Sequence, residues 1–303
     1  MKVRIACLQI ASKPYDWDYN MEKASSMIKE AADNGADICL LPEVFIPGYS
    51  LTKKNFEHAE SLDGPTINAL LELAKKLNVH ISGSIIEKTD KDFYNTMVLI
   101  GPNGLLGTYH KIYVFGSEQE FWKRGKNVSI IDTKFGSIGL GICADMHYAK
   151  LWKQYAGKVD LILICSAWPD VSKVKLTYAK HELDLCKSLP VKISSVLEVP
   201  TAYCNAAHKC LGTLPLVGTL KCAGFSKIVQ NGKVVASFDS GDEGILYGDV
   251  EIADQRPTPE PSRFKNWIKY SYREKIPRDF MEKIVPIYSR MSYRRNKKKF
   301  LNK

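Results

Sequence analysis

Hydrophobic and polar positions follow two different periods along the first third of the chain. Apolar and polar side chains alternate over residues 3–10, which predicts a strand, and apolar side chains recur at helical spacing over residues 20–34. A buried strand is expected at 37–41, a second amphipathic helix at 66–77, and a further strand at 79–86. This order of strand, helix, strand, helix and strand is typical of a layered α/β domain.

The remaining pattern adds more strands and two more helices. Strands are expected over residues 97–100, 105–109, 128–132, 137–142, 161–165, 199–205, 224–229, 234–238 and 245–250. Helices are expected over residues 147–155 and 174–188. The last three strands are expected to be antiparallel, around a turn at residues 230–233. The pattern therefore favours one α/β unit with mixed sheets over residues 1–255, without an internal linker.

The composition and the positions of the cysteines are typical of a globular protein with free thiols. The chain has 303 residues, of which 45% are hydrophobic and 25% are charged, as in ordinary soluble globular proteins. No apolar run approaches membrane-spanning length, and the N-terminal run alternates too strongly for a signal peptide. The eight cysteines are scattered through strand-like runs without framework spacing, which favours free thiols in a reducing cytoplasm over disulfides.

The net charge of +10 is concentrated at the C-terminal end. Residues 263–303 hold fourteen lysines and arginines against three acids, so that the rest of the chain is nearly neutral. A proline-spaced connector at residues 256–261 precedes this basic tail, which defines residues 256–303 as a second part of the chain. We expect the tail to be solvated or to pack in a dimer. Binding of nucleic acid or of an anionic surface is the alternative, although the tail has no recognised nucleic-acid fold.

Three predicted strands end abruptly in a side chain capable of chemistry. Glu43 follows the strand at 37–41, Lys111 follows the run at 105–109, and Cys143 follows the strand at 137–142. If these strands are neighbours, the carboxylate, the ammonium and the thiol converge at one edge of a sheet. Taken singly, each residue has an ordinary alternative: a surface or capping carboxylate, a solvated lysine, and a small core residue.

The motifs around these residues resemble the nitrilase, or carbon–nitrogen hydrolase, superfamily. They are Leu-Pro-Glu at 41–43 with Pro-Gly-Tyr at 47–49, Tyr-His-Lys at 109–111, and Gly-Ile-Cys-Ala-Asp at 141–145, and the later motifs Gly-Phe-Ser-Lys at 224–227 and Glu-Gly-Ile-Leu at 243–246 agree. The order Glu, Lys, Cys with gaps of 68 and 32 residues is similar to the superfamily's. The resemblance covers residues 3–252. It implies a four-layer α-β-β-α sandwich, with two mixed sheets between helices, that forms a homodimer or a higher homo-oligomer.

The resemblance also implies a role for each residue. Cys143 attacks the substrate carbon as a thiolate, Glu43 takes the thiol proton, and Lys111 stabilises the oxyanion together with the backbone N–H of Ala144. The superfamily has a second glutamate that supports the lysine, and both Glu118 and Glu120 lie in the matching stretch. The distance to Gly125 along the chain favours Glu118. No cofactor and no metal ion are implied.

Substrate contacts are expected from the turn after the cysteine and from nearby aromatic residues. The expected substrate-binding residues are Tyr49, Glu120, Ala144, His147 and Trp168. The chain departs from many members because no Pro-Glu and no arginine follow the cysteine closely. His147 is interpreted as pocket wall, since Glu43 already supplies a base.

The resulting hypothesis is a hydrolase that cleaves a non-peptide C–N bond in a small linear amide or carbamoyl compound through a thioester. The enzyme alternatives are hydrolysis of a nitrile and acyl transfer to an amine. The non-enzyme alternative is an anion-binding scaffold that uses the basic tail.

Overall fold

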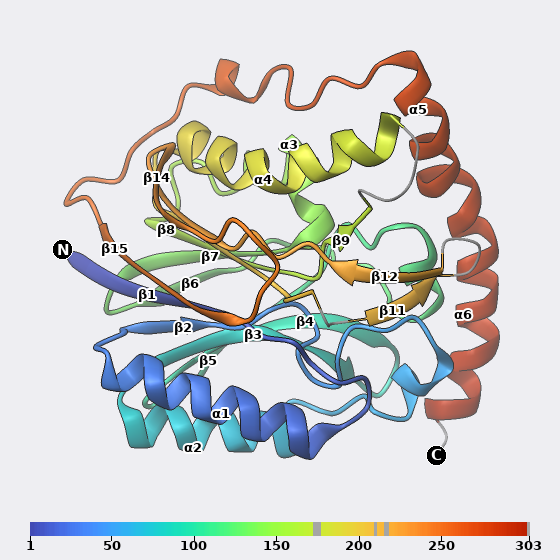
Figure 1. Ribbon diagram of the computed structural model, residues 1–303, viewed down its shortest axis with the longest axis horizontal. Helices are drawn as coiled ribbons and strands as arrows, with labels where there is room; N and C mark the ends of the chain where they lie inside the picture. The colour runs from blue at the N-terminus through green and yellow to red at the C-terminus, as the bar shows by residue number, and fades with distance from the viewer. Residues whose placement is uncertain (172–176, 209–210, 215–217, 302–303) are drawn as a thin grey trace.

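The first of two large sheets contains both the earliest and the latest strand of the sandwich. The computed structural model describes residues 1–171, 177–208, 211–214 and 218–301 (Figure 1). The strand order in the first sheet is β15 (Gly244–Glu251), β1 (Lys2–Gln9), β2 (Ile38–Leu40), β3 (His80–Lys88), β4 (Phe93–Gly101) and β5 (Gly104–His110). The pairs β1–β2 and β2–β3 are parallel, and the other pairs are antiparallel.

The second sheet also has six strands of mixed direction. Its order is β14 (Lys233–Ser237), β13 (Lys227–Gln230), β10 (Thr201–Asn205), β8 (Leu161–Ser166), β7 (Gly136–Ile142) and β6 (Ile130–Thr133). A small third sheet joins β11 (Leu211–Leu214), β12 (Gly218–Cys222) and β9 (Pro169–Asp170), and the sequence pattern did not predict it.

Helices cover the outer face of each large sheet. Figure 1 shows α1 (Trp17–Asp33) and α2 (Pro65–Leu77) on the first sheet, and α3 (Ala149–Trp152) and α4 (Thr177–Leu197) on the second. Each helix buries one apolar stripe, as Met21, Ala24 and Ile28 do for α1. The predicted four-layer α-β-β-α sandwich with two mixed sheets is therefore confirmed.

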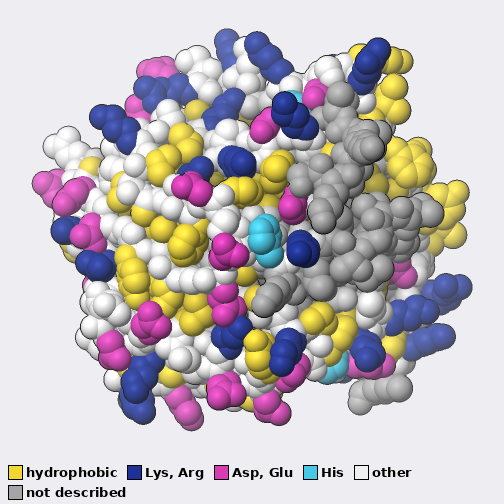
Figure 2. Space-filling view, viewed as in Figure 1, with side chains coloured by type: hydrophobic (Ala, Val, Ile, Leu, Met, Phe, Trp, Pro, Cys, Tyr) yellow, Lys and Arg dark blue, Asp and Glu magenta, His cyan; other side chains and the backbone are white. Residues whose placement is uncertain are grey.

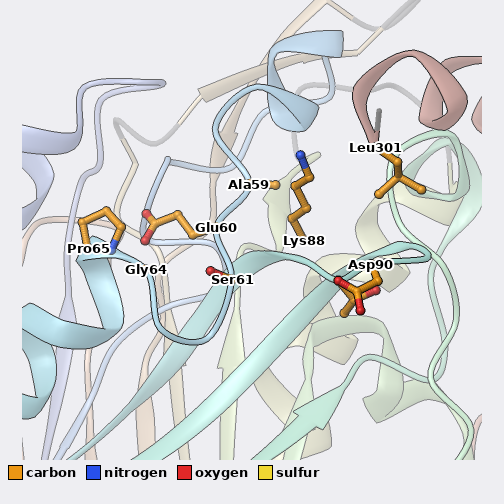
Figure 3. A pocket seen from close by; sticks show the side chains of 9 residues that line it. Ala59, Glu60, Ser61, Gly64, Pro65, Lys88, Asp90 and Leu301 are labelled. Carbon is orange, nitrogen blue, oxygen red and sulfur yellow. The ribbon is translucent and has the colours of Figure 1, made fainter. Parts of the chain in front are cut away.

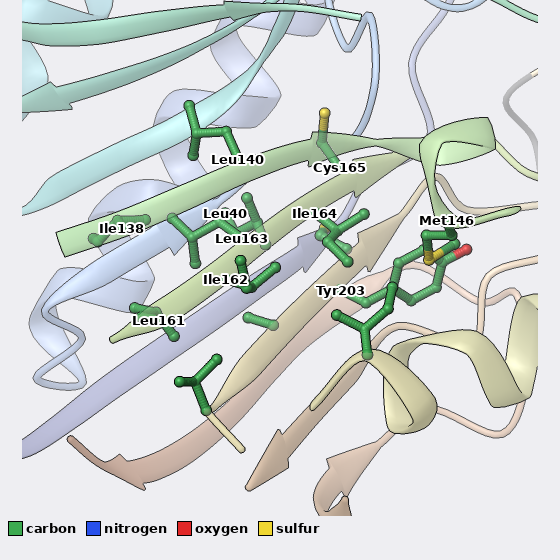
Figure 4. Packing of buried hydrophobic residues seen from close by; sticks show 14 of the residues in the cluster. Leu40, Ile138, Leu140, Met146, Leu161, Ile162, Leu163, Ile164, Cys165 and Tyr203 are labelled. Carbon is green, nitrogen blue, oxygen red and sulfur yellow. The ribbon is translucent and has the colours of Figure 1, made fainter. Parts of the chain in front are cut away.

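The main core lies between the sheets, where both contribute aliphatic side chains (Figure 4). Leu40 of β2, Leu140 of β7 and Leu163 of β8 are fully buried there. Every residue of β8 is buried, because this strand has a parallel neighbour on each side and a covered face above and below. This explains why residues 161–165 form a continuous apolar run.

Several of the expected elements differ in their details. The helix predicted at 147–155 is shorter, at Ala149–Trp152, and the strand predicted at 224–229 begins at Lys227. The strand predicted at 245–250 was expected beside the hairpin at 230–233, but β15 pairs antiparallel with β1 in the first sheet, where Leu8 faces Ile245. Hairpin β13–β14 stays in the second sheet. The helix predicted at 174–188 is described from Thr177 and continues to Leu197, and residues 174–176 lie outside the described residues.

The basic tail is largely helical and packs on its own chain. After η4 (Pro261–Phe264) come α5 (Tyr272–Asp279), the π-helical turn η5 (Phe280–Ile284) and α6 (Val285–Leu301), which run down one side of the sandwich in Figure 1. Phe264 and Trp267 are buried in the main core, and the Trp267 indole N–H donates to the Met146 carbonyl oxygen at 2.8 Å. No helix in the described part of the chain is long and apolar enough to span a membrane.

Candidate active site

The three predicted reactive residues follow strands that are not neighbours. Glu43 follows β2 and Lys111 follows β5 in the first sheet, with β3 and β4 between them, whereas Cys143 follows β7 in the second sheet. The condition of neighbouring strands, under which convergence was predicted, is therefore not met. The groups still converge, because β4 reverses direction between β3 and β5, so that β2 and β5 end at the same edge.

A buried lysine lies between two carboxylates at this edge. The Lys111 Nζ donates to Glu43 Oε1 at 2.7 Å and to both carboxylate oxygens of Glu118 at 2.8 Å. We call these three residues the carboxylate–lysine cluster. The Lys111 side chain has no exposed surface, and Glu43 and Glu118 are 1% and 4% exposed. An ammonium so fully removed from water is stable only when it is paired, as it is here twice.

Further hydrogen bonds fix each carboxylate. Glu43 accepts from the Asn95 side-chain amide at 2.7 Å and from the Ala167 backbone N–H at 2.9 Å. Glu118 accepts from the Tyr49 hydroxyl at 2.6 Å. Because each acceptor is also bonded to the lysine, the cluster has little freedom to rearrange.

The cysteine lies at a strained turn that a buried aspartate holds. Cys143 begins the short helix η3 (Cys143–His147) with a left-handed φ of 45°, and it is 8% exposed. Asp145 accepts from the Ile142 N–H at 2.9 Å, from the Tyr109 hydroxyl at 2.8 Å and from the Tyr113 N–H at 2.9 Å. Tyr109 and Tyr113 flank Lys111 along the chain, so this aspartate ties the lysine segment to the cysteine turn. Backbone strain of this kind persists where the surroundings impose it, often at active sites.

Two glycines permit the close approach of these segments. A Cβ on Gly141 would lie 2.7 Å from the Trp152 ring, and a Cβ on Gly125 would lie 2.1 Å from the His110 carbonyl oxygen. The Gly125 N–H donates to the Lys111 carbonyl oxygen at 2.8 Å. Any side chain at Gly125 would thus displace the backbone that carries the lysine.

Burial and charge set the protonation of the cluster. Burial raises the pKa of the Cys143 thiol well above its usual value, the Glu43 charge raises it further, and Lys111 only partly opposes this. Burial alone would lower the pKa of Lys111, but the charges of Glu118 and Glu43 raise it well above the usual value. Burial also raises the pKa of Glu118. The resting thiol is therefore protonated at neutral pH, and the ammonium remains charged.

Two predicted pocket residues contact each other beside the cysteine turn. The His147 ring stacks on the Trp168 ring with centroids 4.8 Å apart, and His147 Nδ1 lies 3.3 Å from the Ala144 carbonyl oxygen. His147 Nε2 lies 3.1 Å from Glu182 Oε2 of α4. The Trp168 backbone N–H donates to Asn205 Oδ1 at 2.7 Å. The structure thus brings Tyr49, Ala144, His147 and Trp168 into the surroundings of the cluster.

The two candidate second glutamates point to different partners. Glu118 contacts Lys111, whereas Glu120 accepts a hydrogen bond from the Ser292 hydroxyl of α6 at 2.6 Å. Both belong to the 3-10 turn η2 (Gly116–Glu120), against which the C-terminal helix packs. Of the two, Glu118 is the glutamate placed to support the lysine.

Two polar residues of the site were not identified from the sequence, Asn95 on β4 and Glu182 on α4. Asp145 was included in the motif at residues 141–145 but was given no role. Asn95 and Asp145 are fully buried, and Glu182 is 8% exposed. A sequence signal existed for Asn95, since it interrupts the apolar run of β4 with an amide. Glu182 lies on a helix whose packing the sequence does not specify.

A surface hollow of about 560 Å³ lies elsewhere on the molecule (Figure 3). Glu60, Lys88, Asp90 and Leu301 are among its lining residues, and none of the carboxylate–lysine cluster lines it. Glu60 is already bonded to the N–H and the hydroxyl of Thr66. Within the described residues, no group of three or more His, Cys, Asp or Glu side chains could hold a metal ion.

The known proteins that this chain resembles are described as carbon–nitrogen hydrolases, nitrilases or amidases. The family model described as Carbon-nitrogen hydrolase matches residues 4–260. A Schizosaccharomyces pombe protein described as a probable nitrilase is 29% identical over 85% of this chain and 92% of its own length. An omega-amidase from Xenopus laevis is 37% identical, over 54% of this chain and 62% of its own length. The crystal structure of an amidase from Nesterenkonia sp. superimposes with a TM-score of 0.70 at 19% identity, covering 88% of this chain and 96% of that one.

Proposed function

This chain belongs to the carbon–nitrogen hydrolase family, and from this premise we propose that it hydrolyses a small linear amide through a cysteine thioester. The observation that carries the proposal is the buried Lys111 ammonium, held 2.7–2.8 Å from Glu43 and Glu118 beside the strained turn of Cys143. A protonated thiol, a carboxylate base and a fixed cation are the groups that acyl transfer from an amide requires.

The first half of the reaction forms the thioester. Glu43 removes the proton from the Cys143 thiol, and the sulfur attacks the amide carbonyl carbon. The negative charge that develops on the carbonyl oxygen is stabilised by the Lys111 ammonium and the Ala144 N–H. The C–N bond then breaks, and the leaving nitrogen takes the proton from Glu43 and departs as ammonia or an amine.

The second half releases the acid. Glu43 removes a proton from water, which attacks the thioester carbon, and the same cation stabilises the second oxyanion. The C–S bond breaks, the sulfur regains a proton, and the carboxylic acid leaves. The pKa of Cys143, raised by burial, supports the need for a base in the first half.

The choice of an amide over a nitrile rests on the relatives. The relatives include proteins described as an omega-amidase and as a probable nitrilase. Tyr49 and the stacked pair of His147 and Trp168 are the proposed walls around the acyl group. Carbamoyl compounds fit the same chemistry. Nitrile hydrolysis and transfer of the acyl group to an amine are the alternatives.

Release of ammonia from a panel of amides and nitriles tests the proposal. Cys143→Ala is expected to lower turnover by about 10³-fold or more, because the nucleophile is lost. Cys39→Ala, the same substitution at a buried cysteine of the first sheet, is the matched control and should retain activity. An unchanged rate in Cys143→Ala would contradict the mechanism. A wild-type enzyme that releases ammonia only from nitriles, or only when an amine acceptor is present, would favour an alternative.

We also propose that the enzyme is a cytoplasmic homodimer. Six buried cysteines of the described residues are free, which supports a reducing compartment: Cys7, Cys39, Cys143, Cys165, Cys186 and Cys204. Sedimentation analysis of the purified protein tests the dimer, and a monomer at working concentration would contradict it.

A further inference from the structure

The C-terminal helices present a row of large apolar side chains to solvent. We define the C-terminal face as Ile276, Phe280, Ile284, Ile287, Tyr288 and Met291, which are 44–72% exposed. These are six of the thirteen exposed large apolar side chains in the part of the chain that the structure describes. Apart from the adjacent pair Ile287 and Tyr288, they recur every three or four residues, so they share one side of the rod formed by α5, η5 and α6 over roughly 22 Å. Figure 2 shows apolar side chains along the edge where Figure 1 places these helices.

The opposite side of the rod is attached to the body, which keeps the C-terminal face outward. Pro286, Ser289 and Tyr293 are buried against the rest of the chain. The Tyr293 hydroxyl donates to Asp92 Oδ1 at 3.1 Å, and Lys297 pairs with the same carboxylate. The apolar row is therefore exposed on a helix that packs against the body of the protein, and not on an unattached terminus.

Basic side chains continue the same face toward the end of α6. Arg294, Arg295, Lys298 and Lys299 are exposed, and none of them forms an ion pair with any described residue. Met291, Arg295 and Lys298 are spaced by four and three residues, so the basic group extends the apolar row. In Figure 2 dark blue side chains gather below the yellow edge of the molecule.

We propose that the C-terminal face docks on an anionic lipid bilayer. An amphipathic helix with bulky apolar residues and adjacent lysines and arginines lies in the plane of such an interface. The apolar row enters the boundary between headgroups and acyl chains, and the basic group remains level with the lipid phosphates. Exposed apolar patches of this kind mark interaction surfaces, and the unpaired positive charge selects the sign of the partner.

The basic and apolar side chains of the C-terminal face argue against two other partners, a second copy of this chain and nucleic acid. In a twofold contact through this face, a second copy would offer no free carboxylate to the basic group, because the acids of residues 276–299, Asp279 and Glu282, already pair with Lys283 and Arg278. Nucleic acid would satisfy the basic group but would leave Ile276, Phe280 and Ile284 in water, since contacts to phosphate do not use such residues. An anionic bilayer complements both parts of the face.

Co-sedimentation of the full chain with vesicles tests the proposal. Binding to phosphatidylcholine vesicles that contain phosphatidylglycerol is expected to exceed binding to pure phosphatidylcholine by about tenfold or more. It should weaken as salt is raised, because exposed charges are screened. The variants are Phe280→Ser with Ile284→Ser and Met291→Ser for the apolar row, and Arg295→Gln with Lys298→Gln and Lys299→Gln for the basic group.

Each triple variant is expected to lose at least about tenfold in binding to the anionic vesicles while its hydrolysis of soluble substrate is unchanged. Val234→Ser with Val235→Ser, which removes two exposed apolar side chains from β14, is the matched control and should bind like wild type. Failure of the hydrolase assay would leave this result unaffected, so the two proposals can fail separately.

Three results would overturn the proposal. The first is equal binding of wild type to neutral and anionic vesicles, or none to either. The second is a dimer that becomes a monomer in the apolar variant, which assigns the face to a second copy. The third is binding of duplex DNA that the basic variant loses and the apolar variant keeps. Phe280→Trp adds a direct readout, since brominated lipid should quench its fluorescence beyond the quenching seen in wild type.

Discussion

At the scale of single residues, the notable feature is a lysine that two glutamates share. Lys111 is fully buried, and its bonds to Glu43 and Glu118 are of equal length within 0.1 Å. One carboxylate is proposed as the base, so its negative charge must disappear and return during turnover. The second carboxylate keeps the ammonium paired at the moment when Glu43 is protonated. With two carboxylate partners, the buried ammonium therefore stays paired throughout the proposed reaction.

Glu118→Gln is therefore expected to reduce kcat by about 10²-fold with a smaller change in KM, because the ammonium is no longer held in position. Loss of a neighbouring negative charge also lowers the pKa of Lys111, which Glu118 and Glu43 raise in the wild type. The alkaline limb of the pH–rate profile should accordingly move to lower pH. Steady-state kinetics across pH measure both effects.

Glu120→Gln is the matched control, since Glu120 lies in the same turn but bonds Ser292. It should leave kcat and the pH profile within about twofold of wild type. Equal losses in the two variants would mean that the turn acts only as a structural unit, and that the pairing with Lys111 has no separate role.

At the scale of elements, the C-terminal helix is attached through a carboxylate at the turn between β3 and β4. Asp92 pairs with Lys123 and with Lys297 of α6, and it accepts from the Tyr293 hydroxyl. Burial alone would raise the pKa of Asp92, but the hydrogen bonds from Lys123, Lys297 and Tyr293 hold it below its usual value. A depressed carboxyl pKa stabilises the fold above the unfolded-state pKa, and this stability is lost as pH falls through the folded-state pKa.

Asp92→Asn should lower the free energy of unfolding at neutral pH by about 1–3 kcal/mol, because two cations lose their counter-charge. The difference from wild type should shrink as pH falls through the lowered folded-state pKa of Asp92, because the wild-type carboxyl then loses its charge as well. Urea unfolding at several pH values measures the first effect, and hydrogen exchange over α6 shows whether the helix is released. Asp90→Asn, at an exposed position two residues away, is the control. A constant difference down to the lowest pH would contradict this assignment.

Much of the element order could be predicted from periodicity, and much of the site from the spacing of its motifs. β1, α1 and α2 follow their apolar patterns closely, and the family model covers the stretch of chain that holds Glu43, Lys111 and Cys143. The pairing of β15 with β1 could not be predicted, because strand partners far apart in sequence depend on tertiary packing. For the same reason the pattern did not indicate that the three reactive residues come from two sheets.

The tail and the supporting residues were harder to predict for a different reason. Helices α5 and α6 are rich in charge, contain Pro277 and Pro286, and bury few side chains, so their apolar period is weak. Asn95 and Glu182 act through neighbours that only the folded chain brings close. Local sequence gives little information about such contacts.

At the scale of the whole molecule, the body and the tail share one core. Phe264 and Trp267 belong to the cluster that also holds β7, β8 and β10 residues, and the Trp267 indole bonds the turn that follows Cys143. Residues 1–255 and 256–303 differ in charge, but we expect them to unfold together as a single cooperative unit.

Trp267→Ala should cost about 3–5 kcal/mol of unfolding free energy, as expected for a large aromatic residue in a core. Tyr272→Ala, which removes an aromatic residue that is 79% exposed, should change it by less than about 0.5 kcal/mol. Denaturant unfolding followed by circular dichroism and by proteolysis of the tail should give coincident transitions. A chain ending at Glu260 that keeps full stability would show that the tail is an independent part.

The placement of the reactive groups on two facing sheets links turnover to the spacing of the sandwich. Glu43 and Lys111 extend from one sheet and Cys143 from the other, and the gap between those sheets is set by the packed core and by hydrogen bonds such as that of Tyr109 to Asp145. Protein cores are densely packed and resist compression, so this gap is nearly constant under ordinary conditions. Hydrostatic pressure, or a cavity made by a core substitution far from Cys143, is expected to change the distance between the Cys143 sulfur and the Glu43 carboxylate. With the proposed roles of these residues, we therefore expect the catalytic rate to change with core packing before the protein begins to unfold.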